Sequence, residues 1–507
     1  EYKEYVYEDP NDPRWTHDAL LEQEPKDSPS FRTGGTDAHQ FKRVTDTYSL
    51  GINLTSQVDK INLVKVGASI NKHRLSFDDV DLLQDPSIGD PQITGNPFVK
   101  RFVPDPNNVN QNLDIDQYVR NPLEISAYIQ DKIELESMII NLGLRVDYFS
   151  TDGLVLNDLT DPDIYRPRRS ENVAKSIEER RTYWYRDPES NLQFSPRLGV
   201  AFPITDQGVI HFSYGHFFQL PKFELLYTNP EYKLEPGTGN LGIVGNPELK
   251  PQQTISGEIG LQQGFTSDLA MDITMYFRDI RNLAGTRADE LRLFGGSASY
   301  SQYINSDFGS VIGVVLSLTK RLSNNWAATI DYTFQKARGN GSDPAATRNA
   351  IVDGEQPEIQ LIKLDWDQTN TLNFSFSYTS EHLWGFSFIG QYGSGFPYTP
   401  TFSIDVSSLL TNAGLKPSSF NLDLRAYKDF MIGDLRLSLF LRVFNILDIR
   451  NEEDVYEDSG TANFTIDEFQ ARQLGNPEIV NSIDEFYRDP TFYSEPRRVE
   501  IGASFFF

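Results

Sequence analysis

The sequence contains no cysteine and no apolar run that approaches the roughly 18 residues of a membrane-spanning helix. The missing run excludes a helical membrane protein, and a chain of this size without thiols suits an oxidising compartment. Basic residues are also scarce. The 46 Lys+Arg stand against 72 Asp+Glu, a formal charge of −26, whereas a nucleic-acid binder needs a basic face.

The N-terminus lacks the features of a signal peptide. Residues 1–10 read EYKEYVYEDP, with neither a positively charged region nor an apolar core. The chain is therefore expected to be mature, cytosolic or truncated. Its 507 residues would allow two to four ordinary soluble domains, but the aromatic content, with 34 Phe and 24 Tyr, argues against that interpretation.

Alternation of apolar and polar residues with period two recurs along the whole chain, and helical periodicity is almost absent. In one stretch Leu372, Phe374, Phe376 and Tyr378 share one face, and Thr371, Asn373, Ser375 and Ser377 share the other. The same alternation is present at 140–148, 269–278 and 436–443. A β-sandwich would also alternate, so the loops must distinguish the two folds.

The loops alternate strictly between short and long. The pattern predicts fifteen strands at 41–57, 60–76, 123–134, 137–150, 192–204, 208–218, 251–264, 268–283, 299–322, 326–338, 364–379, 384–396, 419–430, 434–448 and 496–507. Tight turns join strands 1–2, 3–4 and so on to 13–14, and long segments such as 77–122, 151–191, 219–250, 339–363 and 449–495 separate the hairpins. Short turns at one end and long loops at the other are typical of a transmembrane antiparallel β-barrel, with long extracellular loops and short periplasmic turns.

The C-terminus ends inside a predicted strand. Phe507, Phe505, Ala503, Ile501 and Val499 share one face. An ordinary terminal strand of a soluble sheet would explain this pattern by itself. Together with the loops it resembles the assembly signal of bacterial outer-membrane barrels, carried by Phe507 and Phe505, and implies the barrel-assembly machinery as a partner.

Three stretches resemble the barrel of TonB-dependent outer-membrane receptors, especially the Bacteroidetes type. Residues 245–251 read GNPELKP at the start of a strand, residues 303–306 read YINS, and residues 443–448 read VFNILD. Gln252 stands where the family usually has Glu, and Ile446 and Leu447 replace Leu and Phe. The resemblance covers roughly residues 41–507.

This resemblance implies a twenty-two-strand barrel with an N-terminal plug and a TonB-contacting box, and the sequence shows neither plug nor box. An odd strand count also places the two ends of the predicted sheet on opposite sides of the membrane. We therefore expect residues 1–40 to be an extracellular loop, residues 41–507 to be barrel strands and loops, and the mature polypeptide to be several hundred residues longer at its N-terminus, with seven more strands and the plug.

No recognisable motif predicts a cofactor, a metal centre or catalysis. Residues 237–242 match G-x-G-x-x-G, but they sit in a Pro/Gly-rich loop with no following helix. His211 and His216 are five apart on one strand, so they point to opposite faces. Acidic loop clusters such as 78–81 and 452–454 fit no EF-hand spacing, and either solvated surface or a divalent-ion site would explain them.

Aromatic loop residues are the candidate ligand contacts. Trp184, Tyr185, Tyr227 and Tyr232, together with Phe217 and Phe218, could stack on a sugar, a catecholate or a peptide ring. Interfacial or loop packing is the alternative for each of them.

The resemblance implies import of a scarce nutrient, such as a siderophore, glycan or peptide, across the outer membrane of a Gram-negative bacterium. The implied partners are the TonB energy-coupling complex, outer-membrane lipid and lipopolysaccharide, with a surface lipoprotein as a further candidate. A scaffolding barrel without transport activity is the competing hypothesis. A surface hydrolase is a third, although the sequence shows no catalytic triad.

Overall fold

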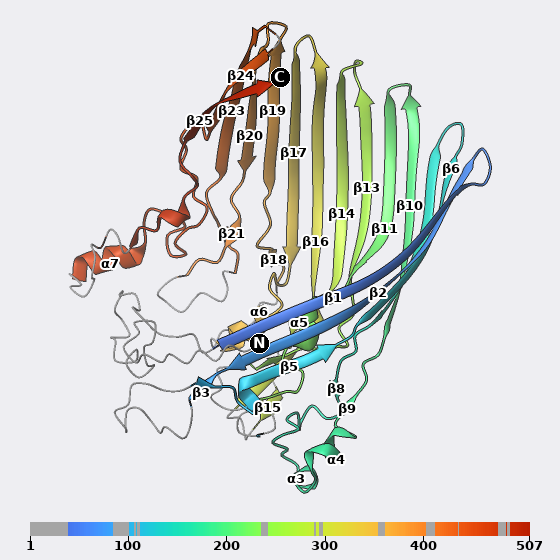
Figure 1. Cartoon of the computed structure of the whole chain (residues 1–507), viewed down its shortest axis with the longest axis vertical. Helices are drawn as coiled ribbons and strands as arrows, with labels where there is room; N and C mark the ends of the chain where they lie inside the picture. Colours follow the sequence, from blue (N-terminus) through green and yellow to red (C-terminus); the bar gives the residue numbers. More distant parts are fainter. Residues whose placement is uncertain are drawn as a thin grey trace.

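The computed structural model describes residues 39–84, 101–105, 108, 112–234, 242–287, 291–293, 298–352, 360–401, 411–433, 435–474, 483 and 487–506. Within these ranges the chain forms one large antiparallel sheet that curves into a deep trough (Figure 1). Its long strands are β1 (His39–Gln57), β2 (Asn62–Asp81), β6 (Leu123–Glu134), β7 (Ile139–Ser150), β10 (Asn191–Thr205), β11 (Gly208–Gln219), β13 (Gln252–Gly264), β14 (Leu269–Thr286), β16 (Ala298–Ser323), β17 (Trp326–Gly339), β19 (Asn370–Ser380), β20 (Trp384–Gly393), β23 (Ser419–Ile432), β24 (Leu435–Phe444) and β25 (Arg498–Phe506). All fifteen predicted strands are confirmed.

Each long strand pairs antiparallel with the next one along the chain. Short strands extend the ladders beyond them: β5 (Ile115–Arg120), β12 (Ile243–Val244), β15 (Leu291–Leu293) and β18 (Ile362–Lys363). Two-residue strands form separate small ladders: β3 (Leu83–Gln84) with β4 (Arg101–Phe102), β8 (Val155–Leu156) with β9 (Tyr185–Arg186), and β21 (Pro397–Tyr398) with β22 (Gly414–Leu415). Among the described residues no ladder joins β1 to β25, so both strands are edges of the sheet.

The tight turns all lie at one end of the trough, at the top of Figure 1. The turn between β16 and β17 holds Asn324 at φ 48° and Asn325 at φ 70°. Two consecutive left-handed residues give the type I′ turn whose twist matches that of a hairpin, and asparagine tolerates this conformation. At the β1–β2 turn, the Asp59 carboxylate accepts hydrogen bonds from the backbone N–H groups of Ile61 (2.7 Å) and Asn62 (2.8 Å). Local side-chain chemistry therefore fixes where these hairpins reverse.

The long connections lie at the opposite end and carry the helices (Figure 1). These are α3 (Ser170–Val173), α4 (Ile177–Arg181), α5 (Phe223–Tyr227), α6 (Ala346–Val352) and α7 (Ile466–Leu474), together with the short 3₁₀ turns Asn112–Asp114 and Pro490–Phe492. Across the part of the chain that the structure describes, no helix has the length and apolar character needed to cross a membrane.

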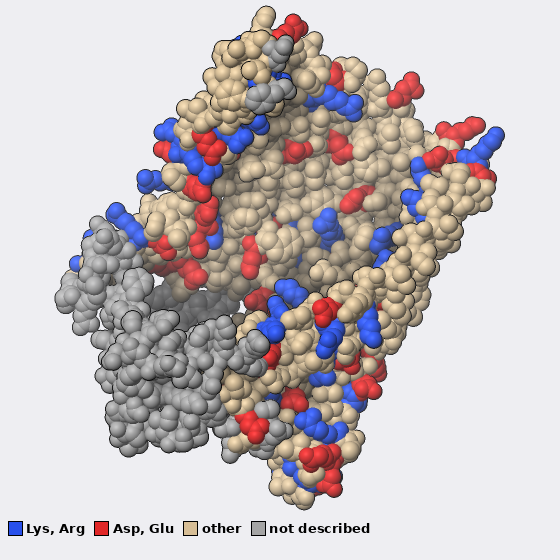
Figure 2. All heavy atoms as spheres, viewed as in Figure 1, with Lys and Arg blue, Asp and Glu red and all other residues tan. Residues whose placement is uncertain are grey.

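The register sorts the side chains into two faces, as the alternation predicted. Asp331, Asn373, Gln391 and Asn421 lie opposite one another on neighbouring strands and so share a polar face. Phe374 lies opposite Ile330 and Gly390, on the other, apolar face. Figure 2 shows acidic and basic groups dispersed over the hollowed side of the trough. In a wide barrel the polar face borders water and the apolar face meets lipid.

Three strand boundaries differ by four residues or more from the sequence-based expectation. β2 continues to Asp81 because β5, in a stretch assigned to a loop, pairs with its last residues. β24 ends at Phe444, because Asn445 adopts a φ of 50° and its side-chain amide donates to the carbonyl of Ile449 instead of extending the ladder. β19 begins at Asn370, after a loop at 364–369 that was predicted to be strand.

The separation of turns and loops gives a prediction about sidedness. We expect the long-loop end to lie outside the cell, so trypsin added to intact cells should cut within 77–122, 151–191 and 449–495, for example after the half-exposed Arg169. Arg321, beside the turn at 323–325, is exposed in the structure but should be spared until the outer membrane is permeabilised. Cleavage after Arg321 first would invert the orientation. Mass spectrometry of the released peptides makes the measurement.

Candidate functional site

The segment between β11 and β13 folds inward over the trough. Its helix α5 buries Leu225 and Leu226, which pack with Leu249 against Leu75 of β2 and Phe149 of β7. Leu75 lies opposite Thr45, and Phe149 lies opposite Glu124, so both apolar side chains stand on the otherwise polar inner face. This cluster holds the segment against the inner wall near the long-loop end.

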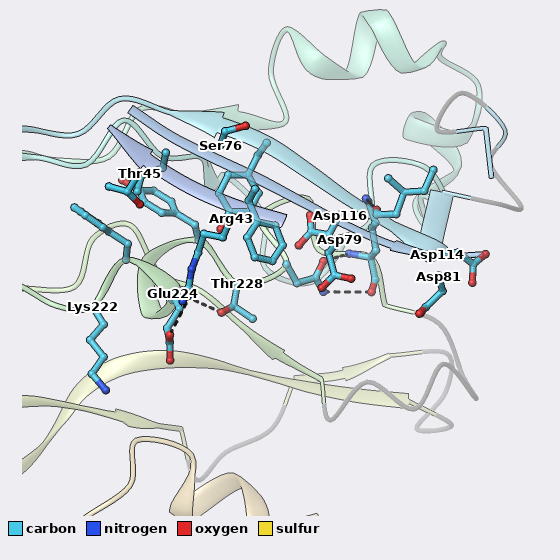
Figure 3. A pocket seen from close by; sticks show the side chains of 18 residues that line it. Arg43, Thr45, Ser76, Asp79, Asp81, Asp114, Asp116, Lys222, Glu224 and Thr228 are labelled. Atoms are coloured by element: carbon cyan, nitrogen blue, oxygen red, sulfur yellow. Dashed lines mark hydrogen bonds and ion pairs between the residues drawn. The ribbon is translucent and has the colours of Figure 1, made fainter. Parts of the chain in front are cut away.

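A cavity of about 780 Å³ lies between α5 and the long-loop ends of β1, β2 and β5 (Figure 3). We call it the mouth cavity. Its wall contains an aromatic group in which the rings of Phe77 and Tyr118 stack 4.9 Å apart with an interplanar angle of 12°. Tyr227 lies 6.0 Å from Tyr118, and Phe223 stacks on Tyr227 at 6.3 Å. Rings in this arrangement give a ligand apolar area at little cost in conformational entropy.

The charged side chains of the mouth cavity are unevenly distributed. Asp79, Asp81, Asp114 and Asp116 gather at one end, and Arg43, Lys222 and Glu224 lie at the other (Figure 3). Arg43 approaches Glu224 with 3.8 Å between Nη1 and Oε2, and both side chains are more than half exposed. A pair with this exposure contributes little to stability, so both groups stay available to a ligand.

The pKa of the Asp116 carboxyl is raised above its ordinary value. Asp116 pairs with Asp79 of β2, which lies 17 residues from Asn62 at the short-turn end of that strand. Roughly 9–11 residues of a strand cross a bilayer, so Asp79 and its partner Asp116 lie outside the membrane. Burial raises the pKa of the Asp116 carboxyl to about 6, the nearby Lys233 ammonium opposes that rise, and the Glu231 carboxylate adds to it.

This shift predicts a pH dependence for the docking of β5. The folded state holds the Asp116 proton more tightly than the unfolded state, so stability is highest near pH 4, falls as the pH rises to about 6, and is level above it. A shift of about two pH units corresponds to at most about 3 kcal/mol. Protection factors for the amides of β5, corrected for intrinsic exchange, should fall between pH 4.5 and pH 7, and Asp116→Asn should abolish the change. A pH dependence that survives in Asp116→Asn would assign it to another group.

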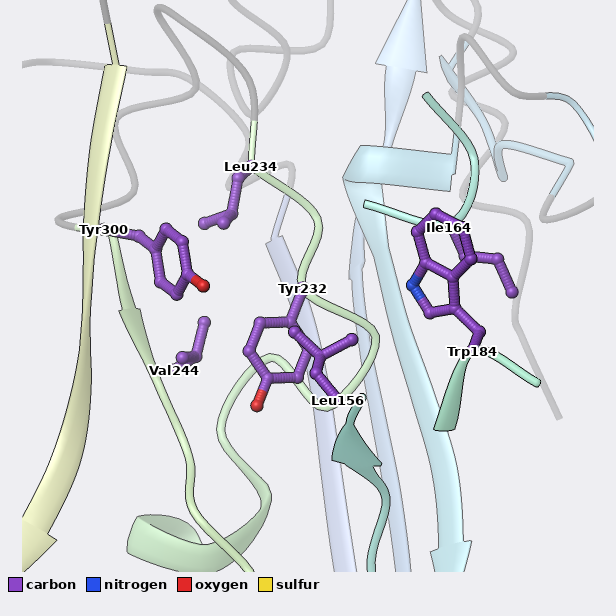
Figure 4. Packing of buried hydrophobic residues seen from close by; sticks show 7 residues of the cluster. All are labelled: Leu156, Ile164, Trp184, Tyr232, Leu234, Val244 and Tyr300. Carbon is purple, nitrogen blue, oxygen red and sulfur yellow. The ribbon is translucent and has the colours of Figure 1, made fainter. Parts of the chain in front are cut away.

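Four of the six aromatic candidates are found in two places. Tyr227 lines the mouth cavity. Trp184 and Tyr232 are buried in a second cluster, here called the loop core, which consists of Leu156, Ile164, Trp184, Tyr232, Leu234, Val244 and Tyr300 (Figure 4). Tyr185 packs against this core, and its hydroxyl donates to the Glu231 carbonyl at 3.4 Å. In this conformation only Tyr227 is in contact with the cavity.

The remaining candidates are also placed by the structure. Phe217 lies on the inner face with the Arg197 guanidinium 4.8 Å above its ring, and Phe218 is its neighbour on β11. His211 and His216 point to opposite faces as predicted, because His211 lies opposite Gly260 of the inner face and His216 opposite Ile255 of the apolar face. Phe505 stands on the apolar face of β25, opposite Leu437. Phe507, residues 1–38 and most of the glycine-rich motif at 237–242 lie outside the described residues.

Metal-ligand geometry is not formed in the described ranges, where no group of three or more His, Asp or Glu side chains could hold an ion. The cavity residues that sequence reasoning missed include Arg43, Tyr118 and Asp116. The acidic run at 78–81 was the available signal. In a strand its alternation puts Asp79 and Asp81 on one face, and the register shows that this is the inner face.

The chain is similar in sequence and fold to known outer-membrane receptors. Residues 4–446 match the family described as TonB dependent receptor-like, beta-barrel. An iron-regulated outer membrane virulence protein of Vibrio cholerae serotype O1 is 23% identical over 200 residues, which cover 37% of this chain and 28% of that protein.

Two solved structures illustrate the likeness of the fold. The outer membrane transporter YddB from Escherichia coli has a TM-score of 0.57 at 12% identity, over 82% of this chain and 52% of that one. The ferripyoverdine receptor of the outer membrane of Pseudomonas aeruginosa has a TM-score of 0.54 at 13% identity, over 93% and 50%. This chain thus spans about half the length of these structures. The family match covers most of the chain, which therefore belongs to the TonB-dependent receptor β-barrel family, outer-membrane proteins of Gram-negative bacteria.

Proposed function

We propose that this chain supplies barrel strands and outer loops of a receptor that imports iron bound to a small organic chelator, of the siderophore class, with energy from TonB. The observation that carries the proposal is the mouth cavity, which opens on the polar inner face of a sheet of this family. Two relatives add support, one named as iron-regulated and one as a ferripyoverdine receptor. The Bacteroidetes type remains part of the proposal, on the three sequence motifs alone.

The two edge strands of the sheet require pairing partners. β1 and β25 are both edges, and an unpaired strand edge in hydrocarbon costs several kcal/mol for each unsatisfied backbone group. We propose that seven further strands close the barrel and that a plug fills it, with the long loops outside the cell. The function is transport, so no catalytic residue is assigned.

The chemistry of the mouth cavity suits a ligand with aromatic rings and charges of both signs. Rings of a catecholate type can stack on Phe77 and Tyr118, while Arg43 and Lys222 pair with anionic groups at one end. Protonated amines of the ligand would face the carboxylates of Asp79 and Asp81.

Uptake of radioactive iron tests this function. A strain that lacks the full-length receptor should lose TonB-dependent uptake from at least one ferric siderophore of a chemically diverse panel, and the restored gene should recover it. Deletion of TonB should give the same loss. Normal uptake of every siderophore, together with loss of a surface complex, would favour the scaffolding alternative instead.

A cavity variant sharpens the assignment. Tyr118→Ala should raise the siderophore concentration for half-maximal uptake roughly tenfold, because it removes the stacking partner of Phe77. Tyr48→Ala is the matched control. Tyr48 is 68% exposed on the apolar face of β1, on the opposite side of the sheet from the cavity residue Thr45, so its removal should leave uptake unchanged at equal surface expression. Equal effects of the two variants would mean that the cavity does not contact the ligand.

A further inference from the structure

The apolar face of the sheet carries a groove on the side away from the mouth cavity. It spans β6, β7, β10 and β11, has a volume of about 450 Å³, and is lined mainly by Ile129, Leu142, Leu144, Pro196, Leu198 and Tyr214. Leu142 lies opposite Leu198, and Leu198 opposite Tyr214, so these side chains share the lipid-facing side. Pro196 lies opposite Leu144, and its compact ring leaves a depression in a row of larger side chains.

Two charged residues, Asp131 and Arg197, also line the groove. The Arg197 guanidinium lies over Phe217 on the inner face, so Asp131 is the one that presents its charge to the groove. Asp131 of β6 lies opposite Val64 on one neighbouring strand and Leu142 on the other, and Ile129 and Ile133 flank it on the same face. Its Oδ1 is buried and has no hydrogen-bond partner within the described part of the chain. The adjacent Lys132 belongs to the opposite, inner face, where it pairs with Glu134. A buried carboxylate oxygen that lacks a donor costs free energy, so Oδ1 calls for a donor from outside the protein.

The depth of Asp131 identifies the donor. A strand rises about 3.3 Å per residue and tilts by about 45°, so each residue adds about 2.3 Å of height. Asp131 precedes Glu134, the last residue of β6, by three residues and so lies roughly 7 Å above the end of the strand. The headgroup region is about 5–8 Å thick on each side of the hydrocarbon. Asp131 therefore lies where lipid headgroups meet acyl chains.

We propose that this groove binds one phospholipid with a primary ammonium headgroup, from the leaflet at the short-turn end. The ammonium would donate hydrogen bonds to the Asp131 carboxylate, and an acyl chain would lie along Leu142, Leu144 and Leu198. A primary ammonium fits because it brings both the opposite charge and N–H donors, whereas a trimethylated headgroup brings only the charge.

Lipid retention by the full-length receptor tests the proposal. Receptor purified in mild detergent and stripped of lipid is titrated with phosphatidylethanolamine or phosphatidylcholine of identical chains, and bound lipid is counted by native mass spectrometry. The wild type should bind one phosphatidylethanolamine at least tenfold more tightly than phosphatidylcholine. Asp131→Asn, which keeps the shape and removes the charge, should lose that preference.

Asp429→Asn is the matched control. Asp429 also has a buried oxygen without a partner and also lies three residues before the end of its strand, but it faces the lumen opposite Ser438. It should retain the wild-type preference. Equal affinity of the wild type for the two lipids, or an unchanged preference in Asp131→Asn, would overturn the proposal. The lipid comparison on the wild type decides the question even if a variant folds poorly.

Discussion

Replacement of Phe374 by arginine is expected to destabilise the folded receptor in liposomes by about 2–4 kcal/mol. Phe374 precedes the end of β19 by six residues, which puts it roughly 14 Å above the end of the strand and inside a hydrocarbon core about 30 Å thick. Its ring covers Gly390, where an added Cβ would collide with the ring. Arginine would lose this contact and also place a charge in lipid.

Ser375→Arg is the control for this substitution, one residue away on the same strand. Ser375 lies opposite Thr329, on the exposed inner face, where water can solvate a guanidinium. Its free energy of unfolding should change by far less. Denaturant titrations of both full-length variants in the same liposomes make the comparison. A larger loss from Ser375→Arg would mean that the two faces are reversed.

Trp184→Ala should unfold the loop core. Trp184 is 5% exposed, packs within the loop core, and donates from Nε1 to the Pro162 carbonyl at 3.2 Å. Truncation of a buried tryptophan costs about 3–5 kcal/mol, which is comparable to the whole stability expected of a cluster this small. Amide protection across β8, β9 and the helices between them should collapse, while the barrel strands keep theirs.

Val173→Ala provides the comparison within the same segment. Val173 is 58% exposed in α3, so its truncation should leave amide protection in the loop core intact. Siderophore uptake by Trp184→Ala distinguishes a role of Trp184 in packing the loop core from a role in direct ligand contact. If Trp184 contacts ligand directly, as its aromatic character first suggested, uptake should fall even under conditions in which the loop core remains protected from exchange.

The barrel wall could be predicted because its information is local. Alternation at 371–378 and the asparagine pair at Asn324 and Asn325 specify a face and a turn without reference to any distant residue. The strand ends were harder to predict. Asn445 stops β24 through a left-handed backbone and a hydrogen bond that the apolar pattern of 435–444 does not encode.

The mouth cavity could not be predicted in the same way. It forms because residues as far apart as Leu75, Tyr118 and Tyr227 meet in space, and a single sequence carries no signal for such contacts. The loop core has the same origin, since Trp184 and Tyr300 are brought together only by the folded loops. Aromatic side chains in a loop thus look alike in sequence whether they become a buried core or a binding wall.

The length of β16 has an electrostatic consequence. Its 26 residues give a height of up to about 60 Å, twice the roughly 30 Å of the hydrocarbon core, so a large part of this wall stands clear of the bilayer. In physiological salt the potential of a charged surface decays over about 8 Å. A ligand that approaches the rim of the trough therefore meets a field set by the protein's own charges, and the anionic lipids below are screened from it.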